Sequence, residues 1–193
     1  MPSLTAVSGS QTRWVNLCEM LDLDSPRWAQ LKHCWGDASD IPELIREFAA
    51  SHGAFDKLFE RVFHQGTYSS ATCATLPHVI SILMTHPANQ RVEQLCHVSI
   101  AVCCADESPP IDLRRALDAE IEGLAQLITE TLPFATRDYE VRYLLAGLAA
   151  GVGQPDLGYV IASLDNSLSC PQCQRDLKCP DCDDVLDALT VLA

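Results

Sequence analysis

The sequence lacks the long apolar segments that export or membrane insertion requires. No run of about 18 apolar residues, the length needed to span a bilayer, occurs in the chain. The segment from Met1 to Asn16 contains Arg13 but no charged stretch followed by an apolar core, so no secretory signal is expected. We therefore expect a cytoplasmic protein without a membrane partner, whose cysteines are reduced thiols or metal ligands and not a disulfide framework.

Basic side chains are also scarce. The chain has 13 Lys and Arg residues against 26 Asp and Glu residues, which gives a net charge of -13 at pH 7. Charge of this sign repels phosphate backbones and anionic lipid headgroups. The composition therefore argues against a nucleic-acid partner and favours a basic protein partner, because complementary charge accelerates association.

Motifs of common catalytic sites are missing. The sequence has no HExxH motif, no GxSxG nucleophile elbow and no Walker phosphate loop. Gly151 and Gly153 follow an expected helix, whereas a dinucleotide fingerprint would follow a strand. The acidic group Asp118, Glu120 and Glu122 fits a solvated helix face better than a catalytic pair. We expect a protein that is not an enzyme.

Apolar residues recur at helical spacing along most of the chain, and long period-two alternation is absent. The pattern predicts helices over 14–21, 26–35, 41–48, 55–63, 69–84, 92–103, 113–132, 139–150 and 157–164. Short connections of roughly two to six residues favour neighbouring helices that pack as antiparallel pairs. The prediction is an all-α fold, a stack of helical hairpins (an α-solenoid), with a non-repetitive helical bundle as the alternative.

Local signals set some of the expected helix boundaries. Ser25 precedes a proline, and Ser39 and Asp40 precede another, so each of these three residues is a candidate N-cap for the helix that follows. Pro77 predicts a kink or a restart inside its helix, since proline cannot donate a backbone hydrogen bond. His97 is expected at a partly buried helical position.

Two CPxC knuckles lie near the C-terminal end of the sequence. They contain Cys170 and Cys173, then Cys179 and Cys182, and five residues separate them. Each knuckle turns tightly enough to aim two sulfur atoms at one ion, which predicts a tetrahedral Zn²⁺ site. Four thiolates leave no open coordination position, so this zinc would be structural. The alternatives are a pair of disulfides, free thiols or an iron-sulfur cluster.

The knuckles divide the chain into two predicted units. The first is a helical domain over 1–166, and the second is the zinc knuckle with a terminal helix over 167–193. Acidic residues outnumber Arg175 and Lys178 in the second unit, which argues against phosphate binding there. Residues at helical spacing are predicted to pack this last helix back on the open end of the stack: Val185, Leu186, Leu189 and Leu192.

The segment from His64 to Thr67 is the best candidate for a functional loop. It lies between two apolar stripes, and Gly66 is expected to end the preceding helix. His64 can donate or accept a proton near neutral pH. The alternative is a helix C-cap in which Gly66 takes a positive φ and His64 satisfies terminal carbonyl groups.

Several segments together resemble a family of bacterial HEAT-like repeat proteins. They are 28–31 (WAQL), 35–42 (WGDASDIP), 63–67 (FHQGT), 71–78 (ATCATLPH), 142–146 (RYLLA) and a C-terminal CPxC element. The resemblance covers most of the chain and implies a stack of helical hairpins. Some members of that family resemble immunity proteins that neutralise polymorphic toxins. The second knuckle is not part of the resemblance, so the zinc prediction rests on the cysteine spacing of this chain.

The sequence therefore predicts a non-catalytic protein, a monomer or weak homodimer, that binds and neutralises a bacterial toxin domain, possibly a basic one. An enzyme that uses the loop over 64–67 and a zinc-dependent nucleic-acid regulator are the alternatives. The helical body, and not the knuckle, is expected to carry the partner surface, because its acidic faces are larger. The candidate partner-binding residues are Trp35, Asp37, Asp40, Glu43, His64, Gln65 and Thr67.

Overall fold

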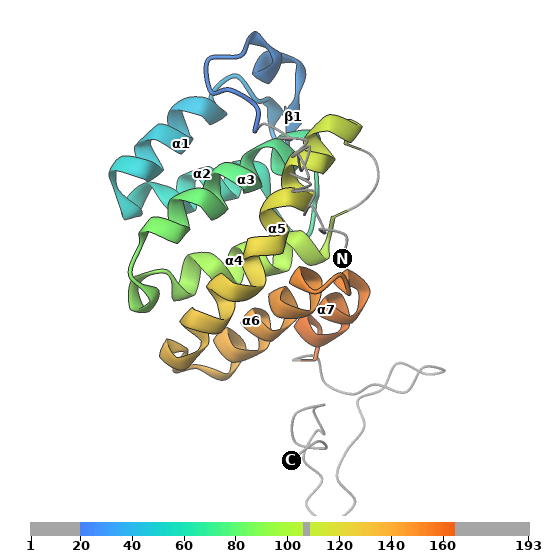
Figure 1. The fold of residues 1–193 in the computed structure, drawn as a ribbon. Helices are drawn as coiled ribbons and strands as arrows, with labels where there is room; N and C mark the ends of the chain where they lie inside the picture. The colour runs from blue at the N-terminus through green and yellow to red at the C-terminus, as the bar shows by residue number, and fades with distance from the viewer. Residues whose placement is uncertain (1–19, 106–108, 165–193) are drawn as a thin grey trace, which may run out of the picture.

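The structure is a computed structural model that describes residues 20–105 and 109–164, and these residues form mainly helices (Figure 1). The α-helices are α1 (Ile41–Ala50), α2 (Phe55–Val62), α3 (Ser70–Thr85), α4 (Val92–Cys103), α5 (Ile111–Thr131), α6 (Asp138–Gly151) and α7 (Pro155–Ala162). The 3-10 helices are η1 (Pro26–Gln30), η2 (His52–Ala54), η3 (Ala88–Gln90) and η4 (Leu132–Phe134). None of the described helices is long and apolar enough to cross a membrane. The all-α prediction is confirmed.

The predicted helix over 26–35 is wrong in its second half. Only η1 is helical there, and Ser25 caps it by accepting a hydrogen bond from the amide of Arg27. The chain then forms an antiparallel pair of short strands, β1 (Lys32–His33) and β2 (Gly36–Asp37). Trp28 is buried, but Trp35 is 58% exposed, so the apparent helical stripe has no common buried face.

Helices α1 and α2 follow their predicted apolar stripes closely. The buried face of α1 begins at Ile41 and ends at Phe48, and that of α2 begins at Phe55 and ends at Val62. The rings of Phe48 and Phe55 lie 5.3 Å apart, which joins the two helices at their connection. Burial of these apolar rows is what stabilises such short helices, which are marginal in isolation.

Helix α3 lies at the centre of the fold and runs without interruption through Pro77, so the predicted restart does not occur. The side chain of Ser69 accepts a hydrogen bond from the amide of Thr72, and the Thr72 hydroxyl accepts one from the amide of Ser69, which forms a capping box. Most of α3 is buried on all sides. A helix that is apolar all round belongs to the interior of a protein.

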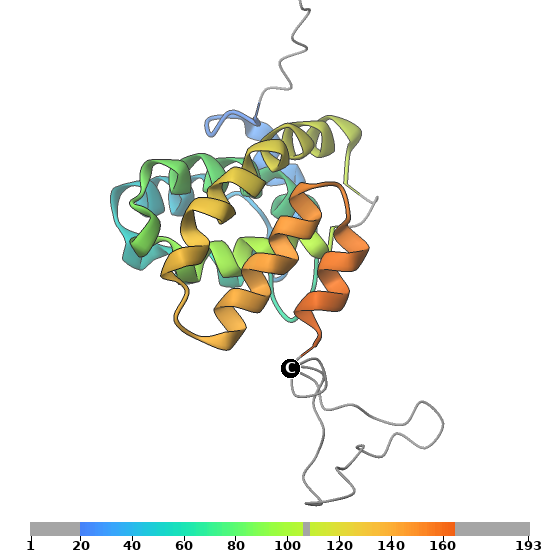
Figure 2. The same cartoon turned by 60° about the horizontal axis from the view of Figure 1, so that its bottom comes forward.

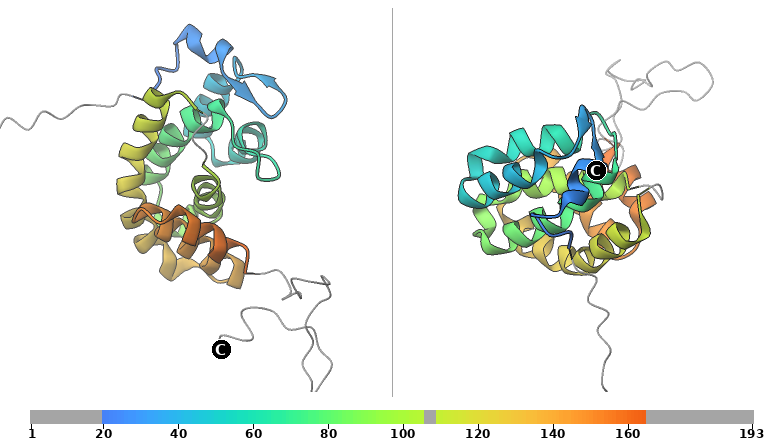
Figure 3. Two further views of the ribbon diagram at one scale, coloured as in Figure 1. Left: turned by 90° about the vertical axis from the view of Figure 1, so that its right-hand side faces the viewer. Right: turned by 90° about the horizontal axis from the view of Figure 1, so that it is seen from above.

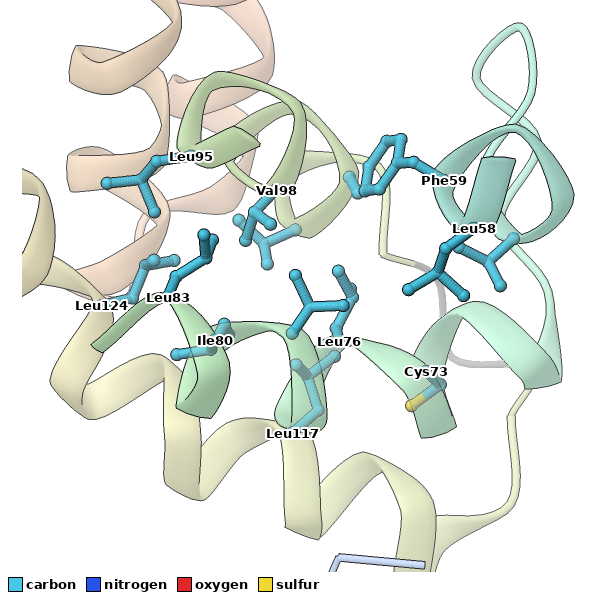
Figure 4. Close-up of a cluster of buried hydrophobic side chains, with 14 of the residues drawn as sticks. Leu58, Phe59, Cys73, Leu76, Ile80, Leu83, Leu95, Val98, Leu117 and Leu124 are labelled. Carbon is cyan, nitrogen blue, oxygen red and sulfur yellow. The ribbon is translucent and has the colours of Figure 1, made fainter. Parts of the chain in front are cut away.

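Four helices pack against α3, and α6 and α7 pack on the far side of α4. Helix α3 contacts α1, α2, α4 and α5, while α6 contacts α4, α5 and α7. Figure 4 shows the core between α3, α4 and α5, which includes Leu76, Ile80, Leu83, Leu95, Val98, Leu117 and Leu124. The β1–β2 hairpin lies with α1 at one end of the molecule. Helices α6 and α7 lie side by side at the other end (Figures 1 and 2).

The predicted zinc knuckle, the terminal helix and nearly all of the helix predicted over 14–21 lie outside the described residues. The boundary predicted at residue 166 also falls there.

Candidate functional site

The predicted loop from His64 to Thr67 is a tight β-turn. The amide of Thr67 donates to the carbonyl of His64 at 2.9 Å, and the two residues form an antiparallel bridge. Gln65 and Gly66 have φ angles of 50° and 78°, and two successive positive φ values are typical of a type I′ turn. Gly66 has the positive φ that the C-cap alternative assigned to it, but in this turn and not at a helix end. The turn begins after Phe63, the C-cap of α2, so His64 does not cap the helix.

The β1–β2 hairpin lies beside this turn (Figure 3). The amide of Cys34 donates to the carbonyl of Arg61 at 3.1 Å, which attaches the hairpin to the end of α2. The indole of Trp35 then lies 5.2 Å from the imidazole of His64, with the ring planes tilted by 57°. Two of the predicted partner-binding residues, which are far apart in sequence, are therefore in direct contact.

A buried histidine holds the hairpin in position. Nδ1 of His33 accepts a hydrogen bond from the amide of Trp35 at 2.9 Å, so the proton of the neutral ring lies on Nε2. Nε2 is 3.2 Å from Oδ1 of Asp40, and the side chain of His33 is only 4% exposed. Arg61 approaches the other carboxylate oxygen of Asp40 at 3.7 Å. Asp40 therefore links β1 to the start of α1 and the end of α2.

The other predicted polar residues face solvent. The hydroxyl and the amide of Ser39 both donate to the Asp37 carboxylate. These hydrogen bonds, the one from the hydroxyl most of all, lower the pKa of the Asp37 carboxyl. The side chain of Glu43 is 70% exposed and lies 3.6 Å from Arg46. Gln65 and Thr67 are exposed on the turn. Trp35 and these polar side chains are thus accessible, whereas the carboxylate of Asp40 points toward basic groups of its own chain.

A groove of about 470 Å³ adjoins the turn between α2 and α4. It is lined by Phe55, Asp56, Phe59, Glu60, Phe63, His64, Gln65, Gly66 and His97. The rings of Phe55 and Phe59 are stacked at 5.1 Å, and His97 meets them edge-on at 5.8 Å and 5.2 Å. The groove therefore has an aromatic floor, and the turn forms one of its walls.

No pattern in the sequence indicated this groove. Phe55 and Phe59 are buried, as the apolar stripe of the helix predicted over 55–63 implies, whereas His97, expected at a partly buried position, is exposed. The meeting of His97 with Phe59 depends on how α2 packs against α4, and no local pattern encodes that contact. A signal was available for Asp56 and Glu60, because residues four apart lie on one side of a helix.

The described residues offer no alternative metal site. Within 20–105 and 109–164, no group of three or more His, Cys, Asp or Glu side chains is placed to hold a metal ion. Burial raises the pKa of the Cys96 and Cys103 thiols to about 12, which keeps both protonated at neutral pH. These buried thiols pack as small apolar side chains, and Cys34 lies in the hairpin between β1 and β2. The knuckle cysteines Cys170, Cys173, Cys179 and Cys182 are not among the described residues.

No protein-family model matches the chain, and no curated protein or solved structure shows significant similarity to it. The resemblance to HEAT-like repeat proteins therefore stays a prediction from sequence.

Proposed function

We propose that this chain is a non-catalytic binding protein, an immunity protein that neutralises a basic bacterial toxin domain. The observation that carries the proposal is the exposed indole of Trp35, held in contact with His64 by two tight turns. A large aromatic side chain fixed before binding loses little conformational entropy when a partner covers it. Tryptophan is accordingly enriched among residues that dominate binding energy at protein interfaces.

Charge supports a basic partner. The chain carries a net charge of -13, and both Asp37, two residues after Trp35 in the hairpin, and Glu43 on α1 are exposed. Acidic groups around an aromatic centre steer a cationic partner toward it and raise the association rate. The same charge opposes binding to nucleic acid.

We further propose that the helices form a HEAT-like stack of hairpins. In support, α1 packs on α3 and α3 on α5, while α4 packs on α6. His97 of α4 also contacts Phe59 of α2. Odd-numbered and even-numbered helices up to α6 thus form two rows, as expected when successive hairpins stack. The zinc site at Cys170, Cys173, Cys179 and Cys182 is part of this proposal as a structural staple at the end of the chain.

Native co-purification from the source cells, followed by affinity measurement with the retained protein, tests the proposal. We expect a stoichiometric basic protein, and Trp35→Ala should weaken its binding by roughly 30-fold, the effect of an interface hot spot of about 2 kcal/mol. Phe134→Ala is the matched control, because this aromatic residue is 47% exposed but lies on η4. Equal affinity of the Trp35→Ala variant and the unmodified protein would contradict the proposal.

Charge reversal tests the steering argument separately. Asp37→Lys and Glu43→Lys should slow association and reduce its dependence on salt, with a smaller effect on dissociation. Asp156→Lys makes the same charge change on the exposed start of α7 and serves as the control. Association rates measured between 50 and 500 mM salt, roughly a threefold range of Debye length, would reveal the difference. Retention of DNA or RNA in place of a protein would support a nucleic-acid role instead.

A further inference from the structure

We infer that the groove between α2 and α4 binds a basic peptide segment of the partner, with an apolar side chain on the aromatic floor and Lys or Arg at the rim. This inference rests on the proposed function, because it names the chemistry that the same surface recognises. Three features of the groove support it: its floor, its rim and its connection to Trp35.

The floor is apolar and already organised. Phe55 and Phe59 stack on each other, and Phe63 continues the row with its ring 5.6 Å from that of Phe59. His97 braces the first two rings from α4. The volume of about 470 Å³ falls within the range of roughly 300–1,000 Å³ typical of binding pockets. A large aliphatic or aromatic side chain can therefore occupy the groove.

The rim carries open carboxylates. Asp56 and Glu60 are both exposed and lie one helical turn apart, about 6 Å along the axis of α2. The basic residues of the same helix are engaged elsewhere: Lys57 pairs with Glu47 at 3.1 Å, and Arg61 approaches Asp40. Within the described part of the chain, no basic side chain forms an ion pair with Asp56 or Glu60. These two carboxylates are available to cationic groups of a partner.

The groove is continuous with the exposed tryptophan. His64 lines the groove on one side and contacts Trp35 on the other. A peptide that fills the groove therefore reaches the indole with its next residues. Phe55 and Phe59 are only 1% and 4% exposed, so the half-buried rings of Phe63 and His64 offer most of the accessible ring surface to apolar groups and cations. An acidic or purely apolar segment would lack partners at the rim.

Nuclear magnetic resonance titration of the full chain with two synthetic peptides tests the inference. The probes are acetyl-Arg-Leu-Phe-Arg-amide and acetyl-Glu-Leu-Phe-Glu-amide, which differ only in the sign of their charged residues. We expect the basic peptide to shift the ring resonances of Phe63, His64 and His97 at millimolar concentration, and the acidic peptide to leave them unchanged. Glu60→Lys should weaken the affinity for the basic peptide by about fivefold or more. Asp156→Lys, a charge reversal of the same size on the exposed start of α7, should alter its affinity by less than about twofold.

The outcomes separate this inference from the proposed function. Unchanged groove resonances at millimolar basic peptide, or equal shifts with both peptides, would overturn the inference. A basic protein partner that is weakened by Trp35→Ala but not by Glu60→Lys would also overturn it, while the proposed function stands. Peptide binding in the groove without any co-purified basic protein would support the groove chemistry and count against the immunity function.

Discussion

Nε of Arg91 donates a hydrogen bond to Oγ1 of Thr131 at 2.8 Å, and both residues are buried although they lie 40 positions apart. The other guanidinium nitrogens of Arg91 donate to the carbonyls of Leu83, His86 and Leu127 and to the carboxylate of Glu130. Arg91 immediately precedes α4, and its side chain donates hydrogen bonds to carbonyl groups near the ends of α3 and α5. One side chain thus fixes three helices at a single point.

Replacing Arg91 should destabilise the whole helical body. Arg91→Leu removes all the hydrogen bonds of this guanidinium, although the His86 amide still donates to Leu83 and the Thr131 hydroxyl to Leu127. We expect the free energy of unfolding to fall by about 3 kcal/mol. Urea denaturation followed by circular dichroism measures this loss. Arg115→Leu is the control, because Arg115 is exposed on α5 and such changes usually stay within about 0.5 kcal/mol. Similar stability of the two variants would show that the Arg91 network contributes little.

Gly147 allows α6 to pack closely on its neighbours. A Cβ at this position would lie 2.1 Å from Oγ of Ser99 and 2.8 Å from Cδ1 of Ile128. Gly147→Ala should therefore lower the free energy of unfolding by roughly 1–3 kcal/mol through overpacking. Gly53→Ala, where the nearest atom is Oγ of Ser51 at 3.9 Å, should show no such loss. Adding Ser99→Gly to Gly147→Ala should recover part of the stability, and failure to recover any would contradict a steric cause.

The buried carboxylate of Glu140 should make stability depend on pH in the acid range. Desolvation raises its pKa, but hydrogen bonds from the amides of Thr136 and Arg137 and from the Arg137 guanidinium outweigh this and lower the pKa. Because the pKa is lower in the folded protein, the contribution to stability is fully present above the unfolded value of about 4.3. It is lost as the pH falls through the folded value.

Comparison of the unmodified protein with Glu140→Gln between pH 7 and pH 3, a range that spans the ordinary Glu pKa of about 4.3, isolates this contribution. The variant should be less stable at neutral pH, and the difference should shrink as the pH falls below about 4. Glu122→Gln removes one negative charge from an exposed position on α5 and controls for net charge. A difference between the unmodified protein and Glu140→Gln that stays constant with pH would contradict the assignment.

The two CPxC knuckles should bind about one zinc ion per chain. Elemental analysis of protein purified without chelator measures the zinc content. Iron with sulfide, or two disulfides in place of a metal, would contradict the prediction. Cys179→Ser with Cys182→Ser should abolish the zinc and expose the region 169–193 to proteolysis, because metal binding energy is local folding energy. Most of the helical circular dichroism should persist in the double variant. Cys34→Ser is the control, and it should keep both the zinc and the helical signal. A cooperative loss of helix in the double variant would place the knuckle within the main core.

Most helices were predictable because their signals lie within a few residues of each other. The stripe from Ile41 to Phe48 gave α1, and the helix predicted over 69–84 corresponds to α3 within one residue at each end. Apolar residues three and four apart share a helix face, so burial of that face selects the helix whatever its neighbours are. The positive φ of Gly66 was predictable for a similarly local reason, since glycine carries no Cβ.

The sequence by itself determined the helical class of the described chain, most of its helix boundaries and its acidic charge. Tertiary structure decided which of the predicted site residues meet, and it added the groove. Residues 32–37 form a hairpin and not a helix because the Cys34 amide donates to the Arg61 carbonyl and the His33 ring lies against the Asp40 carboxylate. Helical periodicity does not encode either contact. Trp35 reaches His64, and His97 reaches Phe59, for the same reason. Periodicity reports only on neighbours along one element, whereas this surface is formed by side chains from elements that meet after folding.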